Sequence, residues 1–92
     1  MTTKPPVLIV EDSQAVTMLL KSFLDKLGYS NIYSCNNGYA AIKEFKKLVK
    51  AKTPPIVLLD YMLPDMDCRS VFTQILDVQP HARVVLETAT EK

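Results

Sequence analysis

The chain has 92 residues, of which 48% are hydrophobic and 23% are charged, and these values indicate a single folded domain. Its formal net charge of +1 provides no basic excess that would attract nucleic acid or an anionic membrane, so neither is an expected partner. No apolar run approaches the roughly 20 residues that span a bilayer, and the start of the chain lacks the features of a signal peptide, so a cytoplasmic location is expected.

The first half of the chain alternates short apolar runs with helical patterns. Residues 7–10 are apolar and β-branched, which predicts a strand. A helix should follow, with Ser13 at its start and Gly28 just past its end, because apolar residues recur at helical spacing: Val16, Leu19, Leu20, Phe23, Leu24 and Leu27. Residues 32–35 predict a weaker strand, and a second helix after Gly38 should turn these residues inward: Ala41, Ile42, Phe45, Leu48 and Val49.

The second half continues the alternation. Pro54 and Pro55 end the second helix, and residues 56–59 predict a fully apolar strand that ends at Asp60. A loop over residues 61–68 precedes a third helix, which Pro80 ends, and residues 84–86 predict the last strand. Helical connections of this length favour parallel pairing of the strands, so the fold class is α/β.

The composition of the strands predicts their order in the sheet. The first, third and fourth strands are apolar on both faces, as interior strands of a parallel sheet are, whereas the second is mixed and suits an edge. This favours the order 2-1-3-4. The fourth strand is apolar like an interior strand, although no later strand or helix of this sequence covers it.

Acidic residues follow two strands that this order makes neighbours. Glu11 and Asp12 come after the first strand and Asp60 ends the third, and neighbouring strands lie about 4.8 Å apart. Their connections leave on opposite faces of the sheet, and ligands bind in the crevice that opens at such a point. Three converging carboxylates repel one another unless a cation is present, and an oxygen-only, hydrated site suits Mg²⁺ better than Ca²⁺.

This combination suits phosphoryl transfer to Asp60. Thr88 follows the fourth strand beside Asp60 and offers a hydroxyl group, and the small Ala89 comes next. A divalent ion would neutralise the charge of an incoming phosphoryl group while the carboxylate acts as nucleophile. Taken singly, each acid is more typical of a turn or a helix cap, and Asp12 suits both roles. The coincidence of acids on adjacent strand ends favours function.

At these residues the sequence resembles the receiver domain of two-component response regulators. The resembling stretches are residues 7–13, 37–42, 56–67 and 88–89, and they occur in the family's order and spacing over essentially the whole chain. The resemblance implies a flavodoxin-like, doubly wound parallel sheet, with residues 1–92 forming part of one receiver domain. It also implies that Asp60 accepts a phosphoryl group from a phosphohistidine of a sensor histidine kinase, so that the domain is a phospho-acceptor rather than an enzyme.

The resemblance implies the metal ligands as well. Asp12 and Asp60 would bind Mg²⁺ directly, Glu11 would act mostly through water, and the backbone carbonyl of Met62 would complete the protein ligands.

The remaining implied roles concern sensing and tuning. Thr88, with Ala89 beside it, would contact the phosphoryl group and report phosphorylation. Met62 and Thr90 resemble the family's variable positions that tune dephosphorylation.

The sequence departs from the family pattern in three places. The family continues into a fifth strand with a phosphate-binding lysine and further helices, whereas this sequence stops at Lys92. We therefore expect either a fragment of a longer receiver or a chain that pairs with a second copy through its fourth strand. Without the lysine, we expect phosphorylation of this chain to be weak or absent. Cys68 replaces the glycine usual after Met66 and Asp67. Glu87 stands where an apolar residue usually precedes the threonine, and the sequence assigns it no role.

Two other functions compete with the phospho-acceptor. A receiver-like module could work through protein contacts without taking phosphate, and the absent lysine favours this alternative. A phosphatase with an aspartate nucleophile is disfavoured, because such enzymes need a second aspartate where this chain has Met62.

Overall fold

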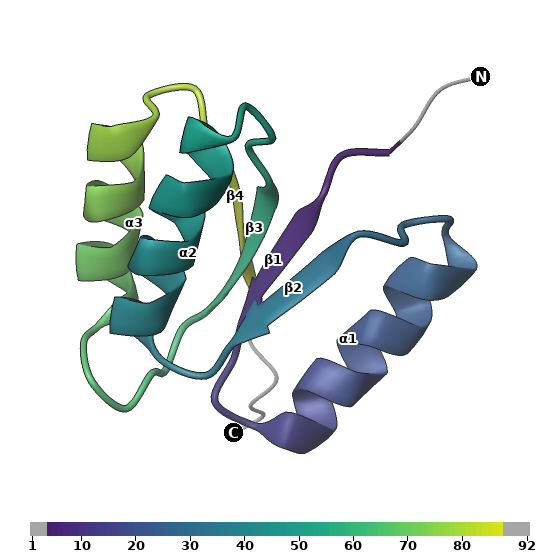
Figure 1. Ribbon diagram of the computed structural model, residues 1–92. Coiled ribbons are helices and arrows are strands. Elements are labelled where there is room, and N and C mark those ends of the chain that lie inside the picture. Colours follow the sequence, from purple (N-terminus) through teal and green to yellow (C-terminus); the bar gives the residue numbers. More distant parts are fainter. Residues whose placement is uncertain (1–3, 88–92) are drawn as a thin grey trace.

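A computed structural model describes residues 4–87, which form one parallel sheet between two helical layers. Four strands lie in the order β2-β1-β3-β4, which confirms the predicted order: β1 (Val7–Val10), β2 (Ile32–Cys35), β3 (Ile56–Asp60) and β4 (Arg83–Glu87). The three helices alternate with the strands along the chain: α1 (Gln14–Lys26), α2 (Gly38–Lys50) and α3 (Cys68–Val78). Figure 1 shows α1 on one face of the sheet and α2 and α3 side by side on the other.

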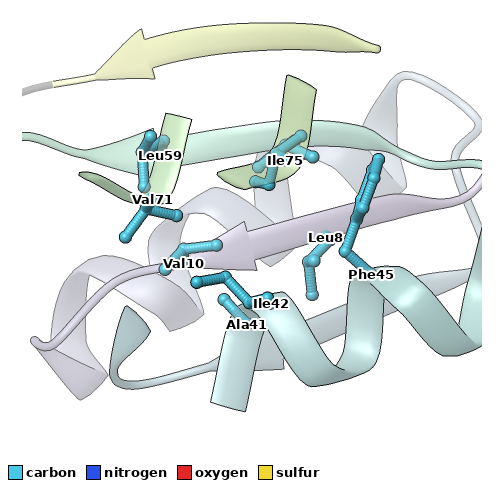
Figure 2. Close-up of a cluster of buried hydrophobic side chains, with 9 residues drawn as sticks. Leu8, Val10, Ala41, Ile42, Phe45, Leu59, Val71 and Ile75 are labelled. Carbon is cyan, nitrogen blue, oxygen red and sulfur yellow. The ribbon is translucent and has the colours of Figure 1, made fainter. Parts of the chain in front are cut away.

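The hydrophobic core lies between the sheet and the pair α2–α3. Figure 2 shows sheet residues such as Leu8 and Val10 against Phe45 of α2 and Ile75 of α3. These side chains are fully buried, because the apolar stripes of both helices and the inward residues of the strands meet there. The inward positions predicted for α2 are therefore confirmed, except that Val49 is only half-buried.

Helix α1 covers the opposite face less completely than its sequence pattern predicts. None of its residues is buried. Val16, Leu20 and Leu24 are half-buried, whereas Leu19 and Phe23 are exposed. The apolar stripe is wider than the contact with the sheet, because α1 is the only helix on this face within residues 4–87.

The helix ends follow the predicted signals. The Ser13 hydroxyl accepts a hydrogen bond from the N–H of Val16 at 3.2 Å and caps α1. Beyond the other end, Gly28 has a φ of 95° and donates its N–H to the carbonyl of Asp25 at 3.0 Å. Strand β4 is longer than predicted, because backbone pairing continues to Glu87 whatever the polarity of its side chain.

The start of α2 is fixed to the loop that follows β3. The Asp65 carboxylate accepts hydrogen bonds from the N–H groups of Gly38 and Tyr39, at 2.8 and 2.9 Å. A Cβ atom at Gly38 would lie 2.8 Å from a methyl of Val71, so only glycine allows this approach of α2 to α3. The loop that carries Met62 is thus held by the packed side of the molecule.

No helix within residues 4–87 combines the length and the apolar character that crossing a bilayer requires.

Candidate functional site

Three carboxylates line up at the carboxyl ends of neighbouring strands β1, β3 and β4. Val10 pairs with Leu59, so Glu11, which directly follows β1, lies beside Asp60. Asp60 in turn pairs with Glu87 of β4. Each of Glu11, Asp60 and Glu87 offers an oxygen within 4.8 Å of the other two. Since Val10 and Leu59 point into the core, alternation turns these carboxylates toward the opposite face. We call Glu11, Asp60 and Glu87 the carboxylate row.

Two of the three residues in the carboxylate row are buried, and Glu87 is half-buried. Glu11 is 4% exposed and Asp60 is 6% exposed. One oxygen of Glu11 accepts a hydrogen bond from the N–H of Ser13 at 2.8 Å. The other oxygen, Oε1, is buried without a hydrogen-bond partner, as is Oε2 of Glu87. A buried, unpartnered carboxylate oxygen is costly, so these atoms call for a proton or a cation.

Burial and mutual repulsion raise the pKa values in the row. Burial raises the pKa of Asp60, and Glu11 adds to the rise, while the backbone N–H groups of Met62 and Tyr61 oppose it. Burial, then the nearby Glu11 carboxyl, with which a protonated Glu87 can share its proton and whose charge repels it, then the charge of Asp60 raise the pKa of Glu87 to about 8. Without a cation, the row therefore holds a proton at neutral pH.

Basic side chains do not neutralise the row. Within residues 4–87 the only ion pair joins Lys47 to Glu44 on α2, away from the strand ends. The negative charge of the row is consequently left to a proton or a bound cation.

The other predicted site residues lie outside the carboxylate row or outside the described part of the chain. Asp12 is exposed and does not join the row. It lines a hollow of about 220 Å³ between β1, α1 and β2 together with Glu11 of the row, and Lys21 and Asn36 also form its wall. Met62 is 65% exposed, and its backbone N–H is directed to Asp60. Thr88, Ala89 and Thr90 lie outside the described residues.

Glu87 is the site residue to which the sequence assigned no role. The predicted fourth strand ended at Leu86 and so left Glu87 outside the sheet. In the structure β4 includes Glu87, and the parallel register pairs it with Asp60. The available signal was a charged residue at the end of an apolar strand next to the acidic strand ends.

The donor set fits a hard divalent cation. Every side-chain donor in the row is a carboxylate oxygen, and two of these oxygens are buried without a partner. Oxygen ligands of this kind suit Mg²⁺, and a bound ion would compensate the repulsion within the row. The residues present therefore fit the ion that the sequence resemblance implies.

The sequence is similar to known proteins over nearly its whole length. The model of the response regulator receiver domain matches residues 7–92. The chemotaxis protein CheY of Thermotoga maritima is 31% identical over 83 residues, which make up 90% of this chain and 66% of CheY. The protein-glutamate methylesterase/protein-glutamine glutaminase of Archaeoglobus fulgidus is 31% identical over 86 residues, 94% of this chain and 24% of that protein. The chain thus spans about two thirds of the length of its CheY relative.

Solved structures agree with these matches. The complex of CheX with CheY, BeF3 and Mg²⁺ from Borrelia burgdorferi superposes with a TM-score of 0.86 and 28% identity, over 98% of this chain and 66% of that one. The receiver domain of the histidine kinase CKI1 from Arabidopsis thaliana gives a TM-score of 0.85 at 17% identity, over 98% of this chain and 69% of that one. This likeness shows a shared fold. With a family match over residues 7–92 and the same order of strands, the chain belongs to the response regulator receiver domain family.

Proposed function

We propose that this receiver domain is a cytoplasmic phospho-acceptor of two-component signalling, which receives a phosphoryl group on Asp60 from a phosphohistidine of a sensor histidine kinase. The observation that carries the proposal is the position of Asp60. Its carboxylate ends β3 at the carboxyl edge of the sheet, 6% exposed, with an oxygen within 4.8 Å of Glu11 on the neighbouring strand. An aspartate at this crevice of a doubly wound sheet meets a ligand rather than the core.

The transfer requires only an oriented nucleophile and compensation of charge. An oxygen of Asp60 forms a bond to phosphorus while the phosphorus–nitrogen bond of the donor breaks, and that electron pair stays on the imidazole nitrogen. The backbone N–H groups of Met62 and Tyr61 oppose the rise in the pKa of Asp60 and so favour its charged, nucleophilic form. A bound Mg²⁺ would neutralise the charge shared by the phosphoryl group and the carboxylates.

Further ligands and sensing residues belong to the same proposal. Asp12 and the backbone carbonyl of Met62 would add oxygen ligands beside Glu11 and Asp60. Thr88 and Ala89 would sense the phosphoryl group, and Met62 with Thr90 would tune its loss.

The alternative is a protein-interaction module that takes no phosphate. Glu87 favours this alternative, because its carboxylate adds negative charge next to Asp60, where an incoming phosphoryl group would sit. The two functions differ in one measurable property, the modification of Asp60.

A second proposed partner is another copy of the chain, paired through β4. Val85 and Leu86 of β4 are exposed, and within residues 4–87 no strand pairs with the outer edge of β4. Light scattering that finds a monodisperse monomer at high concentration would exclude this pairing.

The deciding experiment is labelling by a small radioactive phosphoryl donor in the presence of Mg²⁺. We compare the unchanged protein with Asp60→Asn, and use Asp77→Asn as the matched control, because Asp77 is an exposed carboxylate on α3. We expect an acid-stable, base-labile label on the unchanged protein and on Asp77→Asn. Asp60→Asn, and the unchanged protein with a chelator, should carry none.

Labelling that persists in Asp60→Asn would contradict the assignment of the acceptor. If no variant is labelled, either by the small phosphoryl donor or by a phosphorylated histidine kinase, the interaction module would remain as the function.

A further inference from the structure

The carboxylate at Glu87 gives this receiver a third acidic strand end. We propose that Glu87 is a direct ligand of the divalent cation, so that the ion is held by three carboxylates from three adjacent strands. The inference rests on the cation site of the proposed function and adds to it a residue that the family resemblance does not supply.

The register of the sheet places Glu87 for this role. Asp60 and Glu87 are paired residues of β3 and β4, and the N–H of Tyr61 donates to the carbonyl of Glu87 at 3.3 Å, which extends the pairing beyond the strands. Residues paired in a parallel sheet turn their side chains to the same face. The oxygens of all three residues consequently meet within 4.8 Å without any rearrangement of the backbone.

The unpartnered oxygens point to a ligand at the row. Glu11 is 4% exposed, and its Oε1 is buried without a partner, although its Oε2 is satisfied by Ser13. Oε2 of Glu87 is also buried and unpartnered. Native proteins rarely leave such atoms unsatisfied, so two of them in one row call for a shared proton or for a cation that binds both, and the experiment below separates the two.

The chemistry of the row selects a cation as that ligand. All the converging donors are anionic oxygens, and within residues 4–87 no ion pair supplies them with a lysine or arginine. A hard divalent ion accepts several carboxylate oxygens at once. An anion such as phosphate would be repelled by the row until the cation is in place.

A third carboxylate has two consequences with opposite signs. It increases the affinity for the ion, because affinity rises with the number of anionic ligands. It also destabilises the protein without the ion, because the half-buried Glu87 then either repels Glu11 and Asp60 or has to take up a proton. The free energy of unfolding should therefore depend on Mg²⁺ more strongly than in the same site without the Glu87 carboxylate.

The experiment titrates Mg²⁺ into the purified protein by calorimetry and measures thermal unfolding with Mg²⁺ and with a chelator. The variants are Glu87→Gln, which keeps the shape, and Glu87→Leu, which restores the apolar type that the family usually has there. Asp77→Asn on α3 is the exposed-carboxylate control, and Asp60→Asn removes a ligand of the proposed function.

We expect Glu87→Gln and Glu87→Leu to weaken Mg²⁺ binding about tenfold or more, with Asp77→Asn unchanged. With the chelator, Glu87→Leu should unfold at a higher temperature than the unchanged protein. With saturating Mg²⁺ this difference should shrink or reverse, because only the unchanged protein gains the full stabilisation. A purely structural glutamate would not produce such a reversal.

Equal Mg²⁺ affinity of the unchanged protein and Glu87→Gln would overturn the inference and leave Glu87 as a carboxyl that shares a proton with Glu11. The proposed function would survive that result if Asp60→Asn still lost Mg²⁺ binding and phosphoryl labelling. Absence of Mg²⁺ binding in the unchanged protein would overturn both.

Discussion

The two faces of the sheet are built on different principles. Toward α2 and α3 the strands bury only apolar side chains, and Phe45 and Ile75 are fully withdrawn from water. Toward α1 no helix residue is buried, and the strand ends on that face carry the carboxylate row. The α1 face also buries Val7 and Ile9 of β1, but it combines this apolar packing with charged groups at the strand ends, which lowers its contribution to stability.

The loop after β3 connects the two faces. It begins at Asp60 in the carboxylate row and reaches Asp65, which caps the first turn of α2 on the packed side. The packed face therefore fixes the position of the loop whose first backbone N–H groups oppose the rise in the pKa of Asp60.

The largest expected effect is the loss of stability caused by a substitution in the core between the sheet and α2–α3. Phe45→Ala should lower the free energy of unfolding by about 3–5 kcal/mol, because it leaves a cavity under a fully buried ring. Phe23→Ala on α1 is the matched substitution, and it should cost less than about 1 kcal/mol, because that ring is 55% exposed. Urea unfolding followed by circular dichroism measures both.

Equal losses at Phe45 and Phe23 would contradict the contrast between the two faces. They would show that α1 is packed in solution as tightly as α2.

A smaller effect tests the connection between the faces. Hydrogen bonds from Gly38 and then Tyr39 hold the pKa of Asp65 below its usual range. The unfolded chain therefore binds a proton more readily than the folded protein, and stability falls as the pH drops below about 4 toward the lowered pKa. Asp65→Asn should reduce stability at neutral pH and flatten this acid dependence, as measured by urea unfolding at a series of pH values.

Asp77→Asn serves as the control, since Asp77 is exposed and caps no helix start. If Asp65→Asn retained the full acid dependence of the unchanged protein, the proposed tether between α2 and the loop would be wrong.

Local patterns were sufficient to predict most of the fold. Apolar β-branched runs bounded by prolines predicted the strands, and the mixed polarity of residues 32–35 identified β2 as an edge strand, as the sheet order confirms. Ser13 and Gly28 marked the two ends of α1 correctly, because capping depends on residues close in sequence. The polarity of the strands predicted that β1 and β3 are neighbours, and this order in turn predicted that Glu11 and Asp60, at their carboxyl ends, lie close together.

Features that depend on contacts between distant segments were not predictable. The cap of α2 by Asp65 joins residues that are 27 positions apart, so no local motif encodes it. Phe23 belongs to the apolar stripe that predicted α1, but its exposure depends on what packs beside the helix, which the stripe does not encode. The role of Glu87 could not be predicted, because it depends on the register of β3 and β4. The predicted strand ended one residue too early to pair Glu87 with Asp60.

The most direct test of the carboxylate row is a Mg²⁺ titration followed by the amide resonances of the protein. We predict that the largest saturable shifts occur at Glu11, Asp60 and Glu87, that Lys46 and Gln74 on the packed side stay unchanged, and that Asp60→Asn strongly reduces the shifts. Shifts that centre on other parts of the chain, or that persist unaltered in Asp60→Asn, would show that the three strand ends do not hold the ion.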